Sequence, residues 1–103
     1  MAPSVDTGLL EVASKYVRVL RENNVRFESA WLFGSFAHSR ANEDSDIDIA
    51  LVMRNVEVKF LKKVELMKYR RGVDSRIEPH VLTMDEMDSP FSLEIMRTGV
   101  KVA

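Results

Sequence analysis

Residues 32–52 read LFGSFAHSRANEDSDIDIALV, and this stretch decides the fold. It contains the end of one apolar strand, a turn at Gly34-Ser35, a polar segment at 36–45, and a second strand predicted over 46–53. Ten residues therefore separate the turn from the next strand. We expect the polar segment to form a single helical turn followed by a loop.

The second strand carries the most informative pattern of the chain. Ile47, Ile49 and Leu51 alternate with Asp46 and Asp48, so the two carboxylates project from the same face of the strand. Strand rise places their Cα atoms roughly 7 Å apart. That spacing lets both side chains converge on a pair of hard cations that bridge a triphosphate.

The turn before this strand suits a bulky anion. Gly34 lets the backbone approach a phosphate closely, and Ser35 at the start of a helical turn offers a hydroxyl and amide groups to phosphate oxygens. Taken singly, a Gly-Ser pair is usually a turn and an Asp-x-Asp pair is usually solvated charge. Their combination, with Glu78 in phase on a later strand, indicates a phosphate and metal site.

The rest of the chain supplies elements around this centre. Apolar spacing predicts a helix at 8–22, a strand at 29–33 and a helix at 56–71. A third strand is predicted at 76–82, and Pro79 inside it indicates an edge strand or a bulge. The apolar positions of the second helix are Phe60, Leu61, Val64 and Met67.

A last helix is predicted from Ser89-Pro90 to Gly99, because proline favours the first helical position and glycine ends helices. The sequence leaves open whether residues 100–102 add a short strand. The order α-β-β-α-β-α predicts an α/β (α+β) fold, a small mixed β-sheet with helices packed on one face.

Composition limits the function classes. The 103 residues, 1–103, are expected to form one domain. A net charge of −1, from 15 basic against 16 acidic residues, argues against direct nucleic-acid binding by bulk electrostatics. The chain has no cysteine, no apolar run of membrane length and no visible secretory signal, so we expect a cytoplasmic protein.

Gly34, Ser35, Asp46 and Asp48 match the signature of the nucleotidyltransferase superfamily typified by DNA polymerase beta: Gly-Ser, a spacer of about this length, then Asp-x-Asp. Over roughly 25–82 the chain resembles in particular the minimal nucleotidyltransferases. It departs from the usual pattern in the loop, where position 39 is serine instead of a frequent glycine and position 38 is histidine instead of a frequent basic residue.

The resemblance implies two-metal nucleotidyl transfer from ATP or another nucleoside triphosphate. Asp46 and Asp48 are expected to hold two Mg²⁺ ions, with Glu78 completing the shell of the catalytic ion. Gly34 and Ser35 are expected to grip the outer phosphates. An acceptor hydroxyl then attacks the α-phosphate and releases pyrophosphate.

Several assignments stay open at the level of sequence. Asp74 is the rival of Glu78 as third carboxylate, and Arg40 either reaches phosphate or is an ordinary surface arginine. His80 shares a face with Glu78, so it either lines the cleft or has a structural role. The residues expected on the solvated face of the second helix are Lys59, Lys62 and Lys63.

The resemblance also implies a partner. Minimal nucleotidyltransferases are commonly antitoxins paired with a HEPN toxin, and some transfer AMP onto that toxin. The leading hypothesis is therefore a protein adenylyltransferase antitoxin. The alternative is a non-catalytic nucleotide-binding or antitoxin module that neutralises its partner by binding alone, and self-association is also open.

Overall fold

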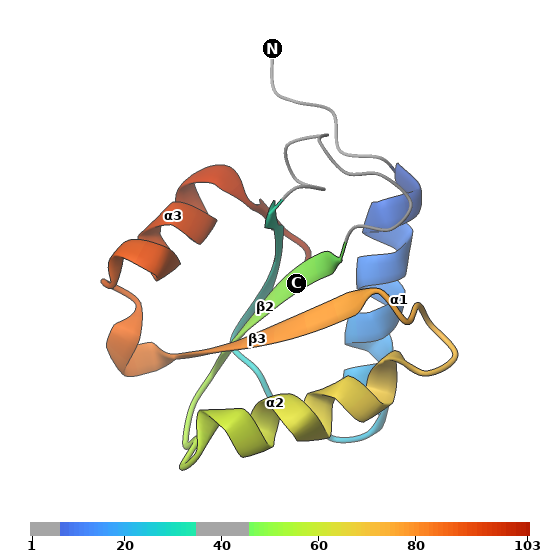
Figure 1. Ribbon diagram of the computed structural model, residues 1–103, viewed down its shortest axis with the longest axis horizontal. Coiled ribbons are helices and arrows are strands. Elements are labelled where there is room, and N and C mark those ends of the chain that lie inside the picture. Colours follow the sequence, from blue (N-terminus) through green and yellow to red (C-terminus); the bar gives the residue numbers. More distant parts are fainter. Residues whose placement is uncertain (1–6, 35–45) are drawn as a thin grey trace.

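The computed structural model describes residues 7–34 and 46–103. The elements, shown in Figure 1, are α1 Thr7–Glu22, β1 Ser29–Phe33, β2 Ile47–Met53, α2 Lys59–Met67, η2 Lys68–Arg70, β3 Ile77–Thr83, η3 Met84–Glu86, α3 Pro90–Thr98 and β4 Val100–Lys101. Both η elements are short 3₁₀ helices. The predicted order of helices and strands is confirmed, and 100–101 does form a short strand.

The four strands form one mixed sheet in the order β3-β2-β1-β4. β1 is antiparallel to both β2 and β4, whereas β2 and β3 are parallel and α2 makes the crossover between them. β2 is thus held on both sides, and Asp48 is its one residue that is not buried. β3 lies at the edge, which fits the expectation for a strand that contains Pro79.

One face of the sheet packs against α1 and α2. The buried residues Tyr16 and Leu20 of α1 meet Leu32 of β1, Ile49 of β2 and Leu66 of α2 in one cluster. The buried Tyr16 hydroxyl donates a hydrogen bond of 2.6 Å to the backbone carbonyl of Leu66. That bond ties the two helices together under the sheet.

The expectation that the helices pack on one face holds for α1 and α2, whereas α3 packs on the other face (Figure 1). Ile95 of α3 clusters with Ala50 and Val52 of β2 and Leu82 of β3. These strand positions are the apolar continuation of the face that carries Asp48. Because β2 is apolar on both faces, each face needs a covering layer.

The second helix is present, but the apolar positions Phe60, Leu61 and Val64 that predicted it do not face the core. All three side chains are exposed, and the buried residue of α2 is Leu66. Lys62 and Lys63 flank Leu66 and are partly buried, so their apolar stems cover part of the helix side that faces the sheet. The lysines predicted on the solvated face therefore include two that turn inward.

Among the described residues, no helix is long and apolar enough to span a lipid bilayer.

Candidate active site

Two carboxylates lie side by side on the face that α3 covers only in part. Asp48 of β2 is directly opposite Glu78 of β3 in the parallel register, so both side chains point to the same side of the sheet. On its other flank Asp48 is opposite Phe33, the last residue of β1. The pair therefore lies at the rim where β1 ends and β2 begins.

Gly34 brings the preceding turn against this pair. Its φ of +79° lies in the left-handed region that favours glycine. A Cβ placed on Gly34 would lie 3.3 Å from Cγ of Asp48 and in collision with one of its carboxylate oxygens. The two halves of the motif are thus in contact, and only a residue without a side chain fits between them.

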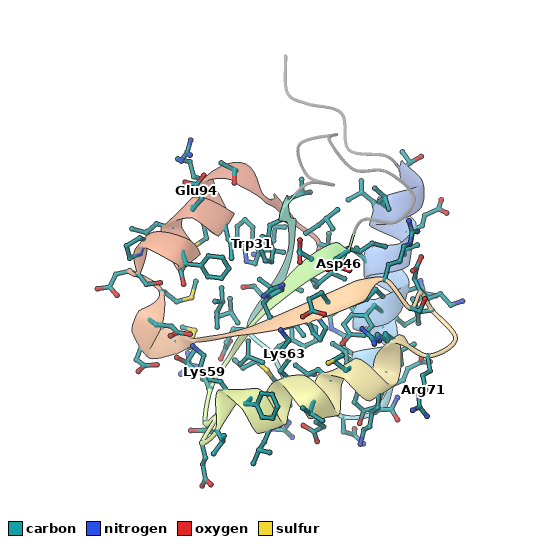
Figure 2. The ribbon with its side chains drawn as sticks, in the orientation of Figure 1. Trp31, Asp46, Lys59, Lys63, Arg71 and Glu94 are labelled. Carbon is teal, nitrogen blue, oxygen red and sulfur yellow. The ribbon has the colours of Figure 1, made fainter. Side chains whose placement is uncertain are left out.

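Asp46 is exposed and lies immediately before β2, at the end of the strand that bears Asp48 (Figure 2). Its spacing of two residues from Asp48 is the spacing that keeps side chains on one face of a strand. Ser35 and Arg40 lie outside the described residues, as do the departures from the family pattern at 38 and 39.

Each of the paired carboxylates has a nitrogen partner. His80 Nε2 lies 3.0 Å from Oδ1 of Asp48, and Lys63 Nζ lies 2.7 Å from Oε1 of Glu78. His80 thus lines the site, one of the two readings left open by the sequence. In Figure 2, Lys63 reaches from α2 toward β3.

Lys63 is the residue that sequence reasoning missed, because it was assigned to the solvated face of its helix. No signal in the sequence indicated this, because the side of α2 that faces the sheet became known only with the burial of Leu66, three residues after Lys63. A crossover helix lies along the strand that follows it, so a lysine on that side comes within reach of a carboxylate on β3.

Two phenylalanine rings pack beside the imidazole of His80. The Phe33 and His80 rings lie 5.0 Å apart between centroids at 68°, and the Phe33 and Phe91 rings lie 5.7 Å apart at 82°. These are edge-to-face arrangements, which orient the rings as well as filling space. Phe91 comes from α3, so both the sheet and α3 contribute to the surroundings of Asp48.

Asp74, the rival third carboxylate, is engaged elsewhere. It lies in the turn before β3, where Oδ1 accepts hydrogen bonds from the backbone N–H of Arg76 at 2.9 Å and from its Nε at 3.1 Å. Oδ2 accepts from the same guanidinium at 2.9 Å. The Arg76 hydrogen bonds hold the pKa of Asp74 below its ordinary value.

The donor chemistry of the rim fits a hard divalent cation. Asp48 and Glu78 supply adjacent carboxylate oxygens, the ligands that Mg²⁺ prefers, and Asp46 is two residues away. Within 7–34 and 46–103, no three acidic, histidine or cysteine side chains converge as a ready metal cluster. The positions next to Asp48 and Glu78 are instead taken by His80 and Lys63, groups that donate hydrogen bonds to carboxylates.

Comparison with known proteins shows the family to which the sequence is similar. A family described as "Polymerase beta, Nucleotidyltransferase" matches residues 15–103. Among curated proteins, none matches the sequence.

Solved structures share the fold. A candidate nucleotidyltransferase of Sulfolobus solfataricus is 22% identical with a TM-score of 0.64, covering 90% of this chain and 78% of that one. A toxin–antitoxin structure with AMP-PNP gives 21% identity, a TM-score of 0.65 and coverages of 87% and 72%. The complex of a tri-AMPylated Shewanella oneidensis HEPN toxin with MNT antitoxin gives 20% identity and a TM-score of 0.61, covering 92% of this chain and 71% of that one.

Proposed function

The chain belongs to the polymerase beta nucleotidyltransferase family, and on that premise we propose that it transfers AMP from ATP to a hydroxyl group of a partner protein. The observation that carries the proposal is the meeting of Gly34, Asp48 and Glu78 at one rim of the sheet. A nucleotidyltransferase needs a close backbone turn for the phosphates and adjacent carboxylates for cations, and this rim supplies both.

In the proposed site Asp46, Asp48 and Glu78 would hold two Mg²⁺ ions, which would supply charge neutralisation of the phosphates and favour ionisation of the acceptor hydroxyl. Ser35 and Arg40 would contact the outer phosphates. Since this chemistry depends mainly on positioning and charge, a small number of side chains is enough.

The acceptor oxygen bonds to the α-phosphorus as the bond to the bridging oxygen of the β-phosphate breaks. Pyrophosphate would leave, and the hydroxyl proton would pass to the carboxylate of Glu78. His80 would orient Asp48, and Lys63 would hold the carboxylate of Glu78 when no cation is bound; their 3.0 and 2.7 Å contacts support these roles. Glu78 is preferred to Asp74 as the third carboxylate because it lies beside Asp48.

The proposed acceptor is a HEPN-type toxin, with this chain as its antitoxin. Support comes from the fold shared with the MNT antitoxin complex that contains a tri-AMPylated HEPN toxin, and with a toxin–antitoxin structure that contains AMP-PNP.

The test combines the purified chain, ATP labelled at the α-phosphate, Mg²⁺, and the protein encoded by the adjacent gene. We expect label on that protein, lost when Asp48→Asn is used or when Mg²⁺ is chelated. Glu94→Gln on the exposed side of α3 is the matched carboxylate control and is expected to transfer normally. Equal transfer by Asp48→Asn, or none by the native chain, refutes the catalytic proposal.

The same experiment separates the non-catalytic alternative. A module that acts by binding alone forms its complex without labelling the partner, and the complex survives the combined Asp46→Ala and Asp48→Ala substitutions.

A further inference from the structure

The outer side of α2 carries a strip of apolar side chains that nothing in the described fold covers. Phe60 is 71% exposed, Leu61 63%, and Val58 and Val64 50% each. Their spacings of three and four residues make Phe60, Leu61 and Val64 neighbours on the helix surface. We call these four residues the α2 strip.

Exposure of this kind is concentrated at α2. Of the seven large apolar side chains exposed among the described residues, four belong to the α2 strip. Single exposed apolar residues are ordinary, whereas contiguous ones mark interaction surfaces. The side of α2 that faces the sheet carries Lys62 and Lys63 beside the buried Leu66. The exposed apolar residues are therefore on a different side of the helix from the one that packs in the core.

The α2 strip leads to the carboxylates. A hollow of about 210 Å³ lies between α2, β3 and α3, and its lining includes Phe60, Phe91 and His80. His80 Nε2 is in turn 3.0 Å from Asp48. One continuous surface therefore runs from the exposed strip, past two aromatic rings, to the rim where transfer is proposed.

Positive charge borders the α2 strip at its C-terminal end. Lys59, Lys62 and Lys63 are neutralised within the fold by Glu86, Glu65 and Glu78. Further along the chain, Lys68 and Arg71 are exposed and take part in no ion pair among the residues that the structure describes. Arg70, between them, is partly buried and donates a hydrogen bond of 2.9 Å to the backbone carbonyl of Ile77. Figure 2 shows Arg71 extending outward beyond the end of α2.

We propose that the α2 strip is the docking surface for the acceptor protein, which covers it with an apolar face bordered by acidic side chains. The inference rests on the proposed function, since it identifies where the acceptor binds. An acceptor seated on Phe60 lies at the mouth of the hollow that leads to Asp48, and its acidic border faces Lys68 and Arg71. A second copy of the chain seated there would instead cover that mouth.

The test uses a double substitution, Phe60→Ser with Leu61→Ser, and the matched control Leu93→Ser. Leu93 is 52% exposed on α3 and lies outside the α2 strip. Because all three side chains are exposed, their replacement is expected to leave the thermal unfolding midpoint nearly unchanged. The probe is the protein encoded by the adjacent gene, and its binding is measured by calorimetry.

We expect the double substitution to weaken the complex by about tenfold or more, the usual effect of removing a central aromatic anchor. Binding of AMP-PNP with Mg²⁺ is expected to stay unchanged, and the Leu93→Ser protein should bind the partner normally. Replacing Lys68 and Arg71 together by glutamate should slow association, most strongly at low salt.

Three results overturn the docking proposal: an unchanged complex after the double substitution, no complex with the native chain, or a native dimer in sedimentation that the double substitution converts to monomer. The last result assigns the α2 strip to a second copy. Asp48→Asn separates this inference from the proposed function, since that variant should keep the complex and lose transfer. A native chain that binds through the α2 strip but transfers nothing refutes the function and leaves the docking surface standing.

Discussion

Replacing Gly34 by alanine tests the contact between the turn and the carboxylate pair. The backbone at Gly34 has φ +79°, and an L-residue in the left-handed region costs about 1–2 kcal/mol. For a chain of this size that cost corresponds to a fall of roughly 4–16 °C in the unfolding midpoint. The new methyl group also collides with the carboxylate of Asp48 and must displace it.

Displacement of the carboxylate is expected to reduce transfer far more than stability. A misplacement of about 1 Å in a catalytic group can cost on the order of 100-fold in rate. We therefore expect Gly34→Ala to lower the transfer rate about 100-fold at a temperature where the variant is fully folded. The assay is label transfer from ATP to the acceptor, run beside thermal unfolding followed by circular dichroism.

Gly72 provides the matched control. It also has φ +79°, but a Cβ there meets nothing within 4 Å. Gly72→Ala should therefore lose comparable stability from backbone strain and keep its transfer rate. Wild-type transfer by Gly34→Ala refutes the reasoning, and so does an equal loss of transfer in the two variants.

Other predictions concern the groups around the site and the layer beneath it. Lys63→Met removes the ammonium partner of Glu78. The affinity for Mn²⁺, measured by titration, should therefore rise by up to about fivefold, which corresponds to the free energy of a partly exposed ion pair. A lower affinity for Mn²⁺ would contradict this. The Arg76 hydrogen bonds lower the pKa of Asp74, so their stabilisation is present above the ordinary value of 3.8 and is lost as the pH falls through the lowered folded value. Asp74→Asn should accordingly narrow the difference between urea midpoints at neutral and acidic pH, and an unchanged difference speaks against it. Tyr16→Phe removes the hydroxyl that donates to the Leu66 carbonyl and should cost about 0.5–1.5 kcal/mol in urea unfolding, the net value of one hydrogen bond. A neutral result would mean that the 2.6 Å bond contributes nothing.

The sequence predicted the elements that depend on local pattern. The alternation of Ile47, Ile49 and Leu51 with polar positions identified β2, and the Ser-Pro and glycine signals marked both ends of α3. The family expectation, which depended on Gly34 and the Asp-x-Asp pair among other residues, is confirmed by the match over 15–103.

The direction in which α2 faces could not be predicted in this way. Helical periodicity reports that Phe60, Leu61 and Val64 share a side of the helix, but the same pattern arises for a core side and for a partner side. The structure resolves this because Leu66 is buried. The side of the sheet on which α3 packs is likewise a tertiary property, set by Ile95 meeting Ala50 and Val52.

The two carboxylates of the site could be predicted from the sequence, whereas their nitrogen partners could not. Asp48 and Glu78 were identified from strand phase, and their adjacency follows once β2 and β3 pair in parallel. Their contacts with His80 and Lys63 depend on register and on the approach of a helix, neither of which the sequence specifies. The roles of all these residues in catalysis stay predictions until the variants are measured.

The position of Asp48 in the middle strand has a consequence for how the protein can respond to ligands. Its neighbours along β2 are buried, and its backbone is flanked by β1 and β3. Opening this segment requires separating non-local strand pairs on both sides, so its amide should exchange with solvent slowly. The backbone of Asp48 is thereby held in place, and the carboxylate is preorganised by the same packing that keeps the chain folded.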